Sequence, residues 1–94
     1  MDTQELLIKV KKGLGITGDY QDETISLYIE EAKAYMLDAG VPEKVIDSPV
    51  SVGTIIRGVS DLWDYGSGVV GLSPYFKERC IQLREVSEDG IQTE

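Results

Sequence analysis

Apolar residues recur along the chain at helical spacing, and no run of alternating apolar and polar residues is long enough to predict a strand. The pattern therefore predicts an all-α fold, a small bundle of four main helices with space for one extra short helix near 42–47. One domain is expected over residues 1–84. Residues 85–94 carry four acids, no base and little apolar content, which predicts a flexible acidic tail.

The first helix is predicted to start near Asp2, whose carboxylate caps it with Glu5 three places on, and to end at Gly13. Ile8 is expected to point away from its apolar face. That face consists of Leu6, Leu7, Val10 and Leu14.

The second helix is predicted to begin between Asp19 and Asp22, both good N-cap residues, and to stop at Gly40 before Pro42. At 100° per residue one side of this helix collects the apolar and aromatic residues expected in the core. They are Ile25, Tyr28, Ile29, Ala32, Tyr35, Met36 and Ala39.

A second, smaller apolar stripe remains on the opposite side of the second helix. It comprises Leu27, Ala34 and, close by, Leu37, among Glu30, Glu31 and Asp38. Single exposed leucines are common on protein surfaces and need no explanation. The alternative hypothesis is a subunit interface formed by Leu27, Glu30, Ala34 and Leu37.

Ser48 followed by Pro49 predicts the start of the third helix, with the serine hydroxyl as the cap. Its apolar face is the clearest in the chain, so this helix is expected at the centre of the bundle. That face holds Val52, Ile55, Ile56, Val59, Leu62 and Trp63, and the opposite, polar face holds Thr54, Arg57, Asp61 and Asp64. Gly53, Gly58 and Ser60 flank the apolar face and would let another element approach closely.

Ser73 and Pro74 repeat this start signal, which predicts a fourth helix from about Pro74 to Arg84. The glycines before it, Gly66, Gly68 and Gly71, predict a flexible hinge between the last two helices. Together the last three long helices define the predicted core. Its members are Ile25, Ile29, Ala32, Met36, Ile55, Ile56, Val59, Leu62, Trp63, Phe76, Cys80 and Leu83.

No catalytic constellation emerges from the sequence, so we expect no enzyme, no cofactor and no metal site. Cys80 lacks a histidine to activate it and falls on an apolar face, which favours a buried structural cysteine. Asp61 and Asp64 share a helix face, but two carboxylates beside Arg57 make a weak cation site and are read as solvated. Tyr28 and Tyr35 are expected at the core edge with their hydroxyls in water.

The chain carries a net charge of −8, concentrated in residues 19–48, and its basic residues form no stripe that would grip phosphates. Specific DNA binding is therefore not expected. No stretch is apolar enough to span a membrane, and the N-terminus does not resemble a signal peptide, so a cytoplasmic protein is expected.

The order of these elements resembles the small head-tail connector (gp6-like, or head completion) proteins of tailed bacteriophages. The resemblance lies in "ELLIKVKKGLGITGDYQDETISLYIEEAKAYMLDAGV" (5–41), in the helix around Trp63 and in "LSPYFKERCIQLR" (72–84). The short "PEKVIDSPVSVG" lead into the third helix departs from the family pattern.

The resemblance implies a structural subunit of a ring, dodecameric in the virion, at the neck beneath the portal protein. Such a ring extends the DNA channel and offers a platform to a tail or stopper protein. DNA would pass through without specific binding, and the protein would be made in the host cytoplasm.

Two other classes fit parts of the sequence. A small acidic adaptor or inhibitor of the DNA-mimic type would also be helical and negative, but its acids should form one broad face. A helix-turn-helix regulator would need Arg, Lys, Asn or Gln at the start of a recognition helix, and neither Ser-Pro helix supplies enough of them.

Overall fold

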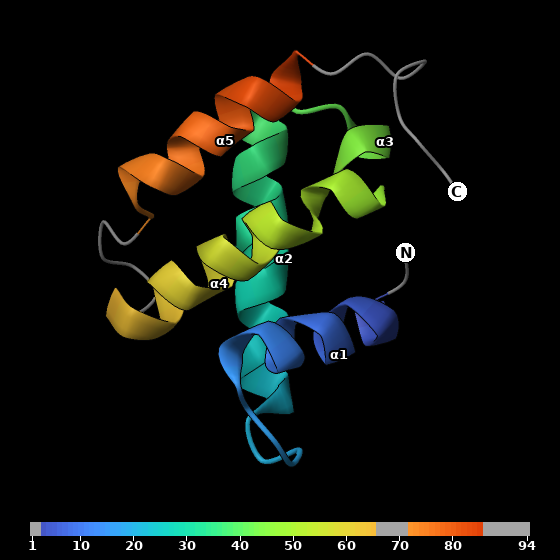
Figure 1. Ribbon diagram of the computed structural model, residues 1–94, viewed down its shortest axis with the longest axis vertical. Helices are drawn as coiled ribbons and strands as arrows, with labels where there is room; N and C mark the ends of the chain where they lie inside the picture. Colours follow the sequence, from blue (N-terminus) through green and yellow to red (C-terminus); the bar gives the residue numbers. More distant parts are fainter. Residues whose placement is uncertain (1–2, 66–71, 86–94) are drawn as a thin grey trace.

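The computed structural model describes residues 3–65 and 72–85, and these residues form helices and turns with no strand (Figure 1). The four main helices are α1 (Thr3–Leu14), α2 (Asp22–Asp38), α4 (Val52–Tyr65) and α5 (Pro74–Arg84). A short helix α3 (Glu43–Ile46) and a 3-10 turn η1 (Pro49–Ser51) connect α2 to α4. The predicted all-α bundle with one extra short helix is therefore confirmed.

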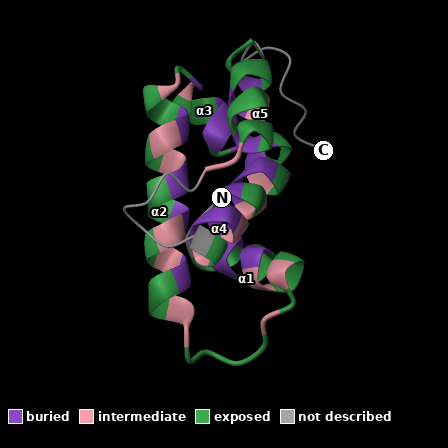
Figure 2. Ribbon diagram, turned by 90° about the vertical axis from the view of Figure 1, so that its left-hand side faces the viewer, coloured by how far each residue is buried: buried purple, intermediate pink, exposed green. Residues whose placement is uncertain are grey.

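The helices are arranged in two layers. Helix α2 lies on one side, and α1, α4 and α5 cross it on the other side, as the two perpendicular views show (Figures 1 and 2). Helix α4 packs against α1, α2 and α5, so the predicted central position of this helix is confirmed. The buried sides of the helices meet between the two layers (Figure 2).

The core contains most of the residues that helical spacing selects. Buried side chains include Leu6, Leu7, Val10, Ile25, Ile29, Ala32, Met36, Ile55, Val59, Leu62, Phe76, Cys80 and Leu83. Ile56 and Trp63, also expected in the core, are only partly buried and pack against its edge. The Trp63 ring meets the Tyr28 ring edge to face, with centroids 6.1 Å apart. Val41, Val45 and Ile46 add a part of the core that the sequence patterns did not select.

Two predictions for the ends of the first two helices need correction. Helix α1 continues through Gly13 to Leu14, and Gly15, with φ of 73°, takes the left-handed position that ends it. Helix α2 begins at Asp22, and its N-cap residue is Gln21, so neither predicted aspartate caps it. Gly40 has φ of 97° and ends α2 as expected.

Ser48 does not cap α4 with its hydroxyl. Its Oγ donates instead to the carbonyl oxygen of Val45 at 2.8 Å, and Ser51 Oγ donates to the same oxygen at 2.6 Å. Both hydroxyls therefore fasten η1 to the end of α3, and α4 starts one 3-10 turn later than the Ser-Pro signal predicts.

The Ser-Pro signal of α5 works as predicted. Ser73 Oγ accepts a hydrogen bond from the backbone N–H of Phe76 at 3.2 Å, and the helix runs from Pro74 to Arg84. The predicted cap near Asp2, the predicted hinge glycines Gly66, Gly68 and Gly71, and the tail beyond Glu85 lie outside the described residues.

Candidate interaction surface

The predicted subunit interface lies on the outer side of α2, directly opposite its buried side. We call Leu27, Glu30, Ala34 and Leu37 the outer stripe. Leu27 is 68% exposed and Leu37 is 54% exposed, and Glu30 and Ala34 are exposed as well. On a helix whose other side is buried, these apolar groups stay in water unless a partner covers them.

Part of the outer stripe lines a shallow groove between α2 and α3. Glu30, Ala34 and Leu37 face Glu43 and Ile46 across a hollow of about 310 Å³. Leu27 lies outside this hollow. The structure therefore joins three of the four residues that the sequence grouped and leaves Leu27 farther along the same helix.

Part of the polar side of α4 is buried rather than solvated. Thr54 is 3% exposed and Asp61 is 5% exposed, whereas Asp64 is exposed. The interpretation of Asp61 as a solvated residue is therefore wrong. Helix α5 covers this side of α4, and Gly58 makes the approach possible because a Cβ there would lie 2.6 Å from the Phe76 ring.

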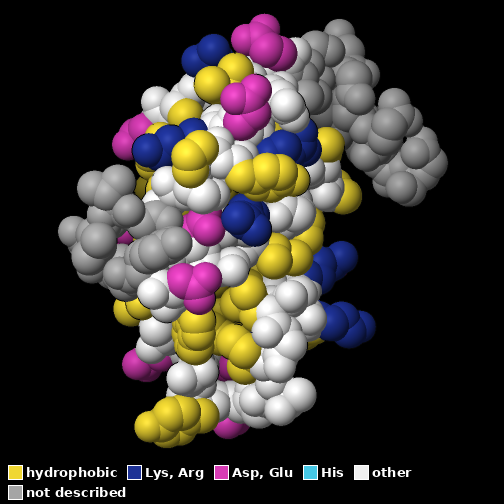
Figure 3. Space-filling model, turned by 60° about the vertical axis from the view of Figure 1, so that its left-hand side comes forward, with side chains coloured by type: hydrophobic (Ala, Val, Ile, Leu, Met, Phe, Trp, Pro, Cys, Tyr) yellow, Lys and Arg dark blue, Asp and Glu magenta, His cyan; other side chains and the backbone are white. Residues whose placement is uncertain are grey.

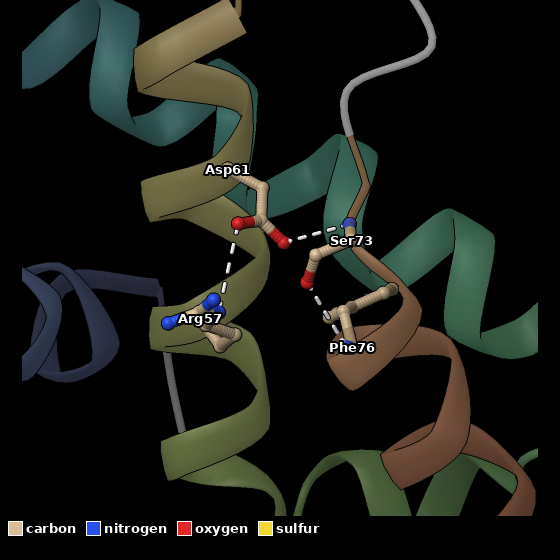
Figure 4. Close-up of polar contacts among 4 residues, drawn as sticks. All are labelled: Arg57, Asp61, Ser73 and Phe76. Atoms are coloured by element: carbon tan, nitrogen blue, oxygen red, sulfur yellow. Dashed lines mark hydrogen bonds and ion pairs between the residues drawn. The ribbon is translucent and has the colours of Figure 1, made fainter.

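Asp61 connects α4 to the start of α5 (Figure 4). Its Oδ2 accepts a hydrogen bond from the backbone N–H of Ser73 at 2.9 Å, and Oδ1 lies 3.6 Å from Nε of Arg57. The carboxylate of Asp61 thus accepts a hydrogen bond from one backbone N–H at the start of α5, that of Ser73. The hydroxyl of Ser73 accepts a hydrogen bond from another, that of Phe76. Arg57 and Asp61 lie one helical turn apart and pair, but Asp61 also has a structural role that helical spacing alone does not reveal.

A second surface lies where α5 crosses α4, and we call it the α4–α5 groove. It is lined by Val50, Gly53, Thr54, Arg57, Tyr75 and Arg79, together with Gly13 and Leu14 of α1 and Ile56 and Ser60 of α4. Two adjoining hollows, of about 380 and 350 Å³, share Gly53 and Tyr75. The Arg57 guanidinium lies 5.3 Å from the centre of the Tyr75 ring, a cation–π distance. Helical spacing does not reveal this groove, because its residues come from separate elements.

Cys80 lies in the core at 1% exposure, and burial raises the pKa of its thiol from 9.0 to about 11. The thiol is therefore protonated at neutral pH and shielded from reagents. No group of three or more metal-ligating side chains occurs among the described residues. Over the same ranges, no helix is long and apolar enough to cross a membrane.

The folded protein should therefore be inert towards a thiol reagent such as dithionitrobenzoate at pH 8 and react stoichiometrically in denaturant. Because the folded pKa exceeds that of an exposed thiol, Cys80 favours the folded state below about pH 9, and this contribution is lost as the pH rises towards 11. Rapid labelling of the native protein would show that the thiol is accessible.

Comparison with known proteins adds one decisive observation. Residues 4–67 match the model of the phage gp6-like head-tail connector protein family. No curated protein and no solved structure matches the chain. The matched range covers α1 to α4 and more than half of the sequence.

The chain belongs to the phage gp6-like head-tail connector family. This family is structural. The match places the protein's role in the phage head-tail junction.

Proposed function

We propose that this protein is a subunit of a ring at the neck of a tailed phage, beneath the portal. The ring extends the DNA channel and serves as the platform for a tail or stopper protein. Membership of the connector family is the observation that carries this proposal. The exposed outer stripe of α2 supports it, because a structural subunit needs apolar surface that only assembly covers.

The charge of the chain supports passage of DNA through such a ring. A net charge of −8 repels phosphates, so the ring would not hold the DNA by electrostatic attraction. The portal protein on one side and the tail or stopper protein on the other are the proposed partners.

Native mass spectrometry over a concentration series, with electron microscopy of the largest species, tests this function. The wild-type chain is expected to form a closed ring alone or on the portal ring of its phage. A chain that stays monomeric even with the portal would contradict the proposal. A dimer that binds DNA would favour a regulator, and binding to a basic protein without ring formation would favour a DNA mimic.

The variant Leu27→Glu/Ala34→Glu should remain helical and lose ring formation. Both residues are exposed on α2, so the core stays intact while two charges enter the outer stripe. We expect assembly to weaken by about 100-fold or more, as for the loss of central interface residues. Circular dichroism checks the fold, and native mass spectrometry measures assembly.

The matched control is Ile8→Glu/Ile81→Glu, which makes the same change in charge at exposed apolar residues of α1 and α5. This control should assemble as the wild type does. Normal assembly of the outer-stripe variant, or equal loss in both variants, would show that the outer stripe is not the interface.

A further inference from the structure

The outer stripe and the α4–α5 groove lie on opposite broad faces of the molecule. The molecule is flat, with principal extents of 39 × 30 × 17 Å, and Figure 1 looks along the shortest of these axes. Helix α2 lies behind α4 and α5 in that view, and its outer stripe points away from them. Gly53 and Arg57, the exposed groove residues of α4, lie on the side of this helix opposite Ile55, Val59 and Leu62, which are buried in the core.

The outer stripe is apolar with acidic neighbours. Leu27 and Ala34 lie along its middle, Leu37 lies near its C-terminal end, and the exposed carboxylates of Glu23, Glu30 and Asp38 flank them. Lys33 is the one basic residue of α2, and it lies partly buried among these acids on the wall of the α2–α3 hollow. A partner for the outer stripe therefore needs apolar surface surrounded by positive charge.

The α4–α5 groove has this complementary character. Two of the three arginines in the chain, Arg57 and Arg79, line it, although the whole chain is strongly acidic. Tyr75 and Val50 add apolar surface at 60% and 44% exposure. Figure 3 shows hydrophobic and basic side chains next to one another on the face over α4 and α5.

The floor of the groove holds the side-chain hydroxyl of Thr54. The hydroxyl oxygen Oγ1 of Thr54 is buried and has no hydrogen-bond partner within residues 3–65 and 72–85. Buried polar groups are normally paired, and leaving one unpaired costs free energy. A side chain that enters the groove with an acceptor would remove this cost.

We infer that the outer stripe of α2 on one copy docks into the α4–α5 groove of the next copy, a contact that rests on the ring proposed above. The contact pairs carboxylates of the outer stripe with Arg79 and with Arg57, which also lies beside Asp61 of its own subunit. It pairs the apolar residues of the outer stripe with Val50 and Tyr75. A symmetric contact of two outer stripes would instead place acids against acids. Joining unlike surfaces on opposite faces is a head-to-tail contact, which generates a ring when the rotation closes.

The test uses two variants that each block one surface. Leu27→Glu/Ala34→Glu blocks the outer stripe, and Tyr75→Ala/Arg79→Glu blocks the groove at exposed or partly exposed positions. Both variants change the net charge by two negative units, as does the control Ile8→Glu/Ile81→Glu. Native mass spectrometry follows each protein in solution and on portal rings, and circular dichroism checks that each is folded.

Each blocked variant alone is expected to stay monomeric, with assembly weakened by about 100-fold or more. An equal mixture should form a heterodimer and nothing larger, since the free groove of one variant accepts the free outer stripe of the other. Only a head-to-tail contact gives a heterodimer from two variants that are each monomeric by themselves. Dimers of the groove-blocked variant by itself would show that outer stripes pair with each other and would overturn the inference.

The two proposals fail in different ways. If the wild type forms rings and the groove-blocked variant forms them equally well, the inference is wrong while the ring function stands. If the wild type forms no ring, either alone or on the portal, the proposed function fails and the inference fails with it. A mixture of folded variants that stays monomeric, beside a wild type that assembles, also overturns the inference.

Discussion

Replacement of Phe76 by alanine is expected to lower the free energy of unfolding by about 3–5 kcal/mol. The ring is fully buried, and α5 is attached to the bundle mainly through this residue, Cys80 and Leu83. The Phe76 ring packs against the bare Gly58 backbone of α4 and lies with its centre 5.5 Å from that of Tyr35. Removing it leaves a cavity where three helices meet.

Urea denaturation followed by circular dichroism measures this loss. The neighbouring variant Tyr75→Ala serves as the control. Because Tyr75 is 60% exposed, its replacement should lower the free energy of unfolding only a little. Gly58→Ala adds a second check. In Gly58→Ala alone, the new methyl group collides with the Phe76 ring, whereas in combination with Phe76→Ala it enters the cavity. The double variant should therefore be more stable than the sum of the two single losses in unfolding free energy predicts. A cost for Phe76→Ala no larger than that for Tyr75→Ala would show that α5 is not held by this ring.

Removal of the Asp61 carboxylate is expected to cost about 1–3 kcal/mol, the penalty for leaving a buried hydrogen-bonding group unpaired. In Asp61→Ala the backbone N–H of Ser73 loses its acceptor at the start of α5. The variant Asp61→Asn keeps an oxygen for this N–H and loses only the charge opposite Arg57. Since the Arg57 side chain is 49% exposed, that pair is worth about 0–1 kcal/mol.

The expected order of stability is therefore wild type, then Asp61→Asn, then Asp61→Ala. Asp64→Ala is the matched control, because Asp64 is exposed on the same helix. Hydrogen exchange of the α5 amides should accelerate in Asp61→Ala, since the bond to Ser73 anchors this end of the helix. Equal stability of Asp61→Ala and Asp64→Ala would show that the bond contributes nothing.

The outer stripe and the Ser73 cap illustrate what helical spacing predicts well. Leu27 and Ala34 fall opposite the buried side of α2 with Leu37 close by, and a helical wheel places them there without any tertiary information. The N-cap of α5 depends on a hydroxyl and an amide three residues apart, which the sequence also encodes. Both features are local, so the sequence predicts them.

Ser48 and Asp61 show where local rules fail. Ser48 has the same Ser-Pro signal as Ser73, yet its hydroxyl donates a hydrogen bond to the carbonyl oxygen of Val45, because α3 brings that carbonyl within reach. Asp61 looks polar on the wheel of α4 and is buried because α5 lies over that side. In both cases a neighbouring helix decides the contact that the side chain makes. The residue pattern within one helix carries no information about that neighbour.

The sequence by itself determined the all-α class, the four main helices, the apolar core face of each and the exposed outer stripe, because these depend on spacing within one helix. The tertiary structure alone decided how α5 crosses α4. That crossing buries Asp61 and Thr54, makes Gly58 the contact point for Phe76, and brings Arg57 and Arg79 together around Tyr75. The physical reason is that these contacts join residues from separate helices, and their distances follow from the packing of whole helices rather than from any local preference.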